Sequence, residues 1–193
     1  GLAEIQSRTG HQKEALSTFK KVTEFHPNRL DTGLKLGRLY RKLKLNQLAE
    51  AEFNRHLQLQ PEFEPSAREL HTLYMDQYRL DKAGSMLQRY VTQFPERTWA
   101  SYAYAKLLLS VENYSEADRI LSLSVKPETE NLENLLFFAH VKYEAKKPAE
   151  ALSILQAADK RFPKHDNVRE KISQLEVELN GSGTPASPVK GKR

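Results

Sequence analysis

The residues most often used for metal binding and nucleophilic catalysis are sparse in this sequence, which has six histidines and no cysteine. The histidines form no HExxH pair, and none is spaced from another ligand type in a way that is specific for a metal. The absence of cysteine excludes disulfides, thiolate zinc sites and cysteine nucleophiles together. We therefore expect no metal site and no cofactor.

The sequence also lacks a recognisable catalytic motif. It contains neither a glycine-rich phosphate loop nor a G-x-S-x-G nucleophile turn. Carboxylate pairs such as Glu50 and Glu52 fall on helix faces that are expected to be solvated, where acid–base chemistry has no dry site. What remains for function are arginines and aromatic side chains, which are typical of binding surfaces, so we expect a protein that is not an enzyme.

The composition is that of an ordinary folded chain of 193 residues, of which 39% are hydrophobic and 28% charged. No stretch approaches a run of about 18 apolar residues, the length that spans a membrane, and no apolar leader segment follows Gly1. The net charge of +5 depends on residues 180–193, which hold three basic residues and no acid; the rest of the chain has 27 basic and 25 acidic residues. This near balance does not favour a general nucleic-acid surface, and both cytoplasm and periplasm are compatible with it.

A period of 34 residues organises most of the sequence. A small residue recurs at this spacing, and a large apolar residue follows each one by four positions: Ala15/Phe19, Ala49/Phe53, Ala83/Leu87, Ala117/Leu121 and Ala151/Leu155. Prolines recur in the same register at Pro27, Pro61, Pro95 and Pro163. Between them, apolar residues spaced at i, i+3, i+4 and i+7 predict pairs of amphipathic helices. The predicted helices cover 11–25, 30–43, 46–59, 64–77, 80–93, 98–111, 114–125, 130–145 and 148–161.

The second repeat matches a known pattern best, with Leu36-Gly37, Tyr40, Ala49, Phe53 and Pro61. This arrangement resembles the tetratricopeptide repeat (TPR) pattern of L-G-x2-Y, A-x3-F and a closing proline. Five repeats in register extend the resemblance over residues 1 to about 163. The resemblance implies an all-α fold, a right-handed α-solenoid of stacked antiparallel helix hairpins in which each hairpin buries apolar surface against its neighbours.

The same register predicts three regions. Residues 1–163 form the TPR array, whose first repeat is truncated because Gly1 falls about five residues into the expected first helix. We therefore expect the chain to be cut from a longer protein. Residues 164–179, with an apolar stripe that includes Val168, Ile172 and Leu175, are predicted to form a C-terminal capping helix. Residues 180–193, rich in glycine, serine and proline, are predicted to be a flexible basic tail or linker.

The resemblance also implies where a partner binds. In TPR proteins the first helices of successive repeats line a concave groove that holds a peptide segment or a helix of another protein. Carried onto this chain, the groove-facing positions are Arg38, Arg41, Arg68, Thr72, Met75, Trp99, Tyr102, Lys106, His140 and Tyr143. Arginine and aromatic side chains are common binding hot spots, so we expect a protein-interaction scaffold, part of a larger protein or assembly, whose ligand has acidic and apolar anchors. A solvated helix face for the basic residues, and ordinary packing between repeats for Trp99 and Tyr102, are the alternatives.

One function found in similar TPR domains is not expected here. Chaperone-binding TPR domains clamp a C-terminal carboxylate with Lys and Asn on one first helix and Asn on the next. At the matching positions this chain has Leu34, Arg38 and Glu69. Because Glu69 would repel a carboxylate, we expect no recognition of an Ile/Val-Asp terminus.

Two other binding modes are compatible with the same residues. A helical-repeat binder of single-stranded nucleic acid would place basic residues on phosphates and use Trp99 and Tyr102 as a stacking platform. Its basic residues would be Arg38, Arg41, Arg68 and Lys106. The chain could instead self-associate through the uncapped N-terminal face or through its tail.

Overall fold

The structure, a computed structural model, describes residues 2–181, apart from the side chain of Arg8. Within this part of the chain every regular element is an α-helix, as predicted. The helices belong to two compact units, Gly1–Leu87 and Gln88–Arg193, and the division falls inside the sixth helix. The tail predicted for 180–193 lies outside the described residues from 182 onward.

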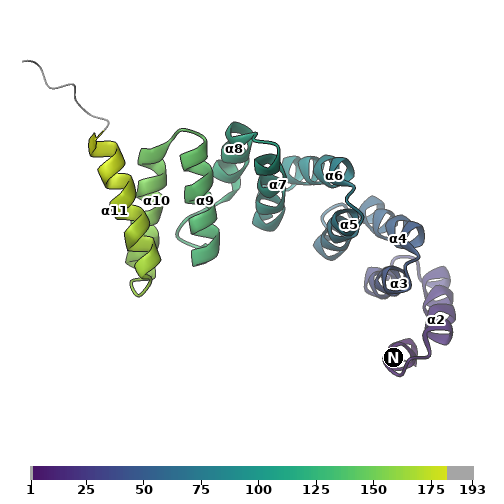
Figure 1. Ribbon diagram of the computed structural model, residues 1–193. Helices are drawn as coiled ribbons and strands as arrows, with labels where there is room; N and C mark the ends of the chain where they lie inside the picture. Colours follow the sequence, from purple (N-terminus) through teal and green to yellow (C-terminus); the bar gives the residue numbers. More distant parts are fainter. Residues whose placement is uncertain (1, 182–193) are drawn as a thin grey trace, which may run out of the picture. The chain divides into compact units, whose positions relative to one another are not determined.

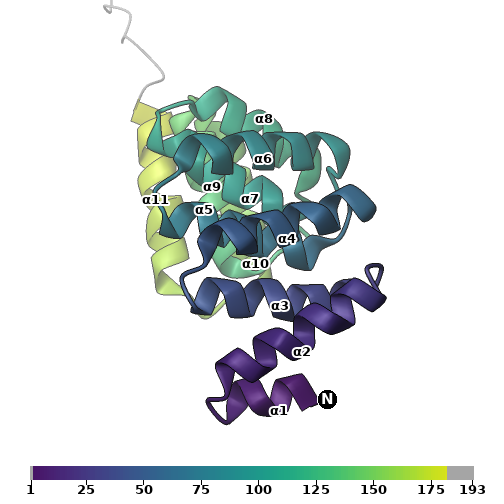
Figure 2. The same ribbon diagram turned by 90° about the vertical axis from the view of Figure 1, so that its right-hand side faces the viewer.

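The N-terminal unit is a series of short helices in which each of the first four packs against the next along the chain (Figure 2). Its helices are α1 (Leu2–Arg8), α2 (Gln12–Phe25), α3 (Leu30–Lys42), α4 (Asn46–Leu59) and α5 (Glu64–Asp76), and α6 (Leu80–Gln93) begins within it. The helix α3 also packs against α5, so the first helices of two successive hairpins are neighbours. This adjacency is what lets residues 34 positions apart share one surface.

The C-terminal unit repeats the same plan (Figure 1). Its helices are α7 (Thr98–Ser110), α8 (Tyr114–Ser124), α9 (Leu132–Glu144), α10 (Pro148–Arg161) and α11 (Asp166–Gly181). Each packs against the next, from α7 to α11. The proline that opens α10 fits because the first turn of a helix does not use that N–H.

The helix bounds agree with the predicted ranges within two residues. The helix α1 lies where the 34-residue register predicts a truncated first helix. Two differences stand out, at the start of α9 and at the end of α11. The side chain of Asn131 accepts a hydrogen bond from the backbone N–H of Asn134, and this cap delays the start of α9 to Leu132. At the other end of the unit, α11 continues to Gly181.

The small residues that recur every 34 positions are almost completely buried in both units. Ala15, Ala49, Ala83 and Ala117 have no exposed surface, and Ala151 is 1% exposed. The large apolar residue one turn later is buried at every repeat, in each case at 5% exposure or less: Phe19, Phe53, Leu87, Leu121 and Leu155. A methyl side chain lets two helix backbones approach, and the bulky residue beside it fills the adjoining space.

A left-handed backbone conformation also recurs every 34 residues, in the turn between the two helices of each hairpin. The amino-acid pattern did not predict it, because the residue types at these positions differ. Lys44, Tyr78, Glu112 and Lys146 all have a left-handed backbone, with φ between 55° and 63°, and Gly10 occupies the same register at φ 85°. In each of the four non-glycine turns the next residue donates its N–H to a carbonyl five positions earlier, for example Leu45 to Tyr40 at 2.9 Å. These bonds form the Schellman motif, which ends a helix by satisfying its last carbonyl groups.

None of the helices described for residues 2–181 is long and apolar enough to span a bilayer.

Candidate functional site

One column of first-helix residues is exposed from the second repeat to the fifth and continues onto α11. Its members are spaced by 34 positions and have unlike side chains: Arg38, Thr72, Lys106, His140 and Gln174. The residues that precede and follow several of them, such as Gly37 and Leu39, are buried. The packing therefore fixes the backbone beneath this column and leaves its side chains free to vary in chemistry, which is the pattern of a binding surface.

In the N-terminal unit, the column borders a hollow of about 370 Å³ between α3 and α5. The hollow is lined by Arg38, Glu64, Pro65, Arg68, Glu69 and Thr72. Three of the predicted groove residues therefore share one surface here. Of the other two in this unit, Arg41 lies next to the hollow through its ion pair with Glu69, and Met75 is half-buried on α5 and does not line it.

Carboxylates already occupy part of this basic surface. Glu69 Oε1 accepts a hydrogen bond from Arg38 Nε at 2.6 Å, and Glu69 Oε2 lies 3.1 Å from an Arg41 guanidinium nitrogen. On the same helix, Arg68 Nε donates to Glu64 Oε1 at 2.7 Å. An anionic ligand would have to compete with both carboxylates for the guanidinium groups.

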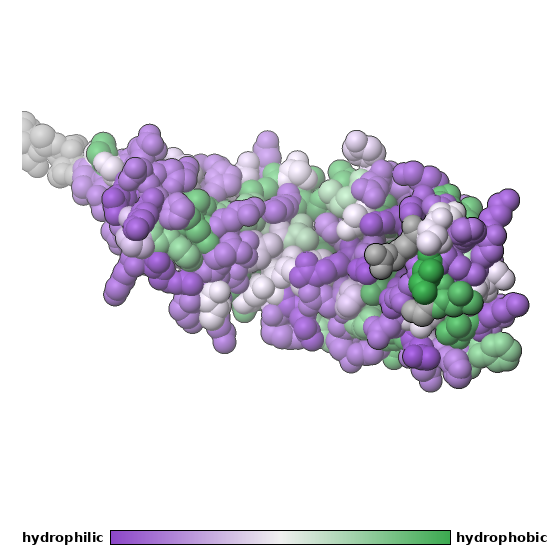
Figure 3. Space-filling model, turned by 90° about the horizontal axis from the view of Figure 1, so that it is seen from below, coloured by the Kyte–Doolittle hydropathy of each residue, from purple (hydrophilic) through white to green (hydrophobic). Residues whose placement is uncertain are grey.

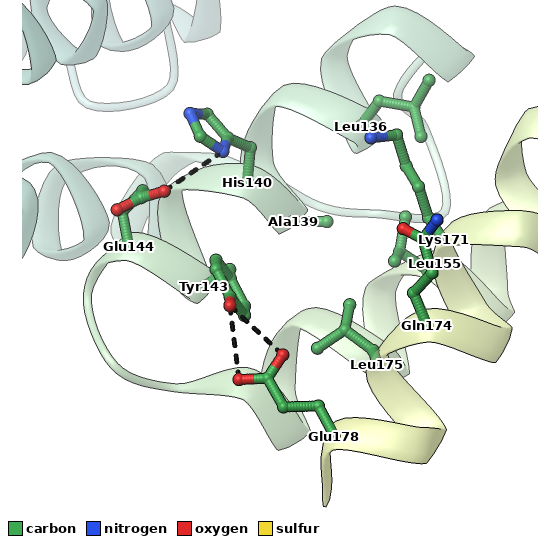
Figure 4. Close-up of a pocket in the computed structure, with 10 residues that line it drawn as sticks. All are labelled: Leu136, Ala139, His140, Tyr143, Glu144, Leu155, Lys171, Gln174, Leu175 and Glu178. Atoms are coloured by element: carbon green, nitrogen blue, oxygen red, sulfur yellow. Dashed lines mark hydrogen bonds and ion pairs between the residues drawn. The ribbon is translucent and has the colours of Figure 1, made fainter.

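In the C-terminal unit, a pocket of about 310 Å³ lies between α9 and α11 (Figure 4). Its lining is Leu136, Ala139, His140, Tyr143, Glu144, Leu155, Lys171, Gln174, Leu175 and Glu178. Two predicted groove residues, His140 and Tyr143, therefore share this pocket. Its floor is aliphatic and its rim is polar, the general composition of a ligand pocket.

Two polar contacts order the rim of this pocket. The phenol of Tyr143 donates to the Glu178 carboxylate, whose two oxygens lie 3.2 and 3.3 Å away. This hydrogen bond and the charge of Glu178 raise the pKa of Tyr143, because both oppose formation of a phenolate. On α9, His140 Nδ1 lies 3.9 Å from Glu144 Oε1.

The remaining predicted groove residues lie in the C-terminal unit and differ in their exposure. Tyr102 is only 6% exposed; its ring lies 5.9 Å from that of Phe137, and burial raises the pKa of its phenol. Trp99 is half-buried with its ring 5.5 Å from Tyr90. Lys106 is exposed, and its Nζ lies 5.7 Å from the Phe137 ring centroid. Since a base cannot stack on a buried ring, Tyr102 does not serve as a nucleic-acid platform in this conformation.

The contribution of α11 to the pocket was missed at the sequence level. Lys171, Gln174 and Glu178 come from the helix predicted to be a solvating cap. The signal was available, because Gln174 follows His140 by 34 positions and so continues the first-helix column.

A hydrophobic surface also lies on α1. Leu2 and Ile5 are 65% and 61% exposed, and Figure 3 shows hydrophobic atoms gathered at this end of the N-terminal unit. They lie on the N-terminal face, one of the two regions for which the sequence allows self-association.

One buried cluster has the residue types of a catalytic triad. His56 Nδ1 lies 2.6 Å from Ser66 Oγ, and His56 Nε2 lies 3.1 Å from Glu52 Oε1. A serine nucleophile has to reach its substrate, whereas neither Ser66 nor His56 has exposed surface. Burial by itself raises the pKa of Glu52, but hydrogen bonds from His56 and Arg55 outweigh burial and lower that pKa. The cluster is thus a satisfied polar contact that joins α4 to α5.

Within residues 2–181, no group of three or more histidine and carboxylate side chains is placed to hold a metal ion.

The chain matches no protein-family model and no curated protein. Solved structures match it over most of its length. MamA superposes with a TM-score of 0.59 at 16% identity, over 96% of this chain and 94% of MamA. YrrB, a TPR protein with an unusual peptide-binding site, gives 0.57 at 17% identity, over 93% and 88% of the two chains. TTC0263, a thermophilic TPR protein of Thermus thermophilus, gives 0.51 at 18% identity, over 91% and 96%.

At these identities the similarity concerns the fold. It agrees with the stacked hairpins, the buried alanine series and the helix bounds. The chain therefore has the tetratricopeptide-repeat fold.

Proposed function

We propose that this protein is a non-catalytic interaction scaffold that binds a peptide segment or a helix of another protein on the exposed faces of its first helices. The observation that carries the proposal is the exposed column of first-helix residues with a hollow beside it in each unit. Repeat proteins use such a face for binding because the second helices supply the packing and leave the first helices one free side.

The chemistry of the two hollows supports a peptide ligand. The hollow between α3 and α5 offers the guanidinium groups of Arg38 and Arg68, each 53% exposed as side chains. The pocket between α9 and α11 offers leucine side chains within a polar rim. Arginine forks and aliphatic pockets recognise backbone carbonyls, acidic groups and apolar side chains, all of which a peptide supplies.

A selection experiment tests the proposal with the full chain. A library of displayed random twelve-residue peptides is selected against the protein, and the recovered peptides are measured by fluorescence anisotropy. Replacing both Arg38 and Arg68 by alanine, or His140 by alanine, is expected to weaken binding of at least one class of recovered peptide by about fivefold or more.

Arg119→Ala is the matched control. Arg119 is 56% exposed as a side chain and is paired with Glu116 on the second helix α8, so its removal leaves both hollows intact. Recovered peptides whose affinity is unaffected by every first-helix variant, in proteins that keep their helical circular dichroism, would show that binding takes place elsewhere.

A further inference from the structure

We propose that two copies of this chain associate through the turns of the second hairpin (α3 and α4) and the third hairpin (α5 and α6). In the dimer, a two-fold axis places the second-hairpin turn of one copy against the third-hairpin turn of the other. The contact is made by the exposed residues of 42–48 and 76–81, which we name the turn surface. None of these residues lines the hollow between α3 and α5, so the association is separate from the proposed peptide binding.

The two turns lie side by side in the N-terminal unit. They occupy equivalent positions in successive hairpins, 34 residues apart. Glu50, in the second turn of α4, accepts two hydrogen bonds from Arg79 and one from Lys82. These bonds tie the start of α4 to the start of α6, so the exposed residues of both turns belong to one surface.

The turn surface is rich in exposed apolar side chains. Leu45 and Leu48, from the second hairpin, each expose at least 40% of their surface. From the third hairpin, Leu80 is 46% exposed and Tyr78 is 88% exposed. Single exposed apolar residues are ordinary, whereas four of them on two adjacent turns form a patch of the kind that mediates association.

The backbone of Tyr78 is a second, independent indication. Its φ of 55° is left-handed, a conformation that is unusual for a bulky residue. The equivalent position of the other hairpins holds glycine or a charged residue: Gly10, Lys44, Glu112 and Lys146. Within residues 2–181 the side chain of Tyr78 makes no hydrogen bond and no ring contact. A strained aromatic residue that packs on nothing in its own chain indicates a contact with another molecule.

The charges of the turn surface identify that molecule as a second copy. Lys42 and Lys44 belong to the second hairpin, and Asp76 and Asp81 to the third. All four are exposed, and none makes an ion pair within the described part of the chain. Asp81 acts electrostatically on Arg79, but that guanidinium is already paired. A surface that is positive at one end and negative at the other complements an identical surface related by a two-fold axis.

Another occupant fits this arrangement less well. An anionic lipid surface would be repelled by Asp76 and Asp81, which flank Tyr78 in the sequence. In the two-fold dimer each of these carboxylates instead faces the lysines of the other copy, and every contact is made twice. The surface is small compared with that of an obligate dimer, so we expect a weak dimer in equilibrium with the monomer.

Sedimentation velocity with the full chain measures this equilibrium. The average mass is expected to rise toward that of two chains as the concentration increases from about 5 μM to about 500 μM. Tyr78→Gly is expected to raise the dissociation constant by about tenfold or more, because it removes the largest apolar side chain of the surface. Glycine suits a left-handed turn, so this variant keeps the fold while it loses the contact.

Two charge variants test the two-fold arrangement. One replaces both Lys42 and Lys44 by glutamate, and the other replaces both Asp76 and Asp81 by lysine. Each variant alone is expected to stay monomeric over the same concentrations, because like charges would meet in its dimer. An equimolar mixture of the two is expected to form a heterodimer at least as tight as the unsubstituted dimer, because every pair of facing charges is then opposite.

Lys146→Glu is the matched control, because Lys146 has the same left-handed position in the turn between α9 and α10. It is expected to leave the dissociation constant unchanged. An unsubstituted chain that stays monomeric up to about 500 μM, or a dimer that survives Tyr78→Gly, would overturn the proposal. So would charge variants that keep their helical circular dichroism but fail to associate when mixed.

Discussion

Gly37 and Gly84 both lie inside helices but have opposite surroundings. A Cβ atom added at Gly37 would overlap the ring of Phe53, whereas one added at Gly84 would meet no atom within 4 Å. The glycine in the first case permits close approach of α3 to the ring on α4. In the second case nothing in the packing requires it.

The two glycines therefore give a paired prediction. Gly37→Ala is expected to lower the free energy of unfolding by about 1–3 kcal/mol, because the added Cβ would overlap the ring of Phe53, which is completely buried. Gly84→Ala is expected to raise it by up to about 1 kcal/mol through helix propensity. Urea denaturation followed by circular dichroism measures both. A stabilised Gly37→Ala protein would mean that Phe53 relaxes without cost.

The buried ion pair of Asp118 and Lys142 makes stability depend on pH. Burial alone raises the pKa of Asp118, but hydrogen bonds from Lys142 and Lys147 outweigh it and lower the pKa below its ordinary value of 3.8. A carboxyl group whose pKa is lowered by folding stabilises the folded state while it is ionised in both states. Its contribution is complete above about pH 4 and is lost as the pH falls toward the folded-state pKa.

Asp118→Asn is accordingly expected to cost about 3 kcal/mol at pH 7, since it leaves a buried lysine short of a partner. The difference from the unsubstituted protein should shrink below pH 4, which urea titrations at several pH values would show. Asp159→Asn, which removes the exposed pair of Asp159 with Arg169, serves as the control and should cost less than about 1 kcal/mol. A cost that stays constant down to pH 2 would assign the effect to packing.

At the scale of elements, the turns inside the hairpins store strain at a regular position. The left-handed residues Lys44, Tyr78, Glu112 and Lys146 have a Cβ where glycine has none. A left-handed conformation costs an L-residue about 1–2 kcal/mol. The Schellman hydrogen bonds and the packing of the two flanking helices outweigh this cost and hold these residues in the left-handed conformation.

Glycine at these positions should relieve that strain. Lys44→Gly and Glu112→Gly are each expected to raise the free energy of unfolding by up to about 1 kcal/mol, after allowing for the greater entropy of glycine in the unfolded chain. Lys42→Gly, at the last residue of α3, is expected to lower it by about 1 kcal/mol because its backbone is helical. Thermal unfolding compares the three, and a loss of stability in all of them would rule out strain at the turn.

Features that depend on nearby residues could be predicted from the sequence, whereas features that depend on contacts between hairpins could not. Helix bounds were predictable because the alanine series, the apolar spacing and Pro148 act locally. The burial of Tyr102 was not, because it depends on Phe137 in the next hairpin. The ion pair of Lys142 could not be predicted either. The register places Lys142 where other repeats have Tyr40, Tyr74 or Leu108. Its acidic partners become apparent only in the packed structure.

At the scale of the whole molecule, each hairpin gains its stability from its neighbours. The cap helix α11 packs on α10 and buries Val168 completely. In repeat proteins the loss of one element destabilises the neighbouring element most, because each repeat contacts only its neighbours. Removing residues 164–193 is therefore expected to expose the apolar face of α10 and to abolish the pocket between α9 and α11.

Hydrogen exchange of backbone amides would show which helices are destabilised when residues 164–193 are removed. Amides of α10 are expected to exchange at least about tenfold faster in the shortened chain, corresponding to about 1.4 kcal/mol, while those of α7 change less. An equal acceleration in α7 and α10 would indicate that the C-terminal unit opens as a single cooperative body.

Lys142 also limits how such an array could be rearranged. Its ammonium group draws on an aspartate from the helix before it and a glutamate from the helix after it, and no other repeat keeps that combination of residues. The hairpin of α9 and α10, transplanted to another position, would keep Glu150 but lose Asp118, so the buried ammonium group of Lys142 would lack one of its two carboxylates. The repeats share a common geometry, yet this hairpin depends on a specific neighbour, the helix α8 that supplies Asp118.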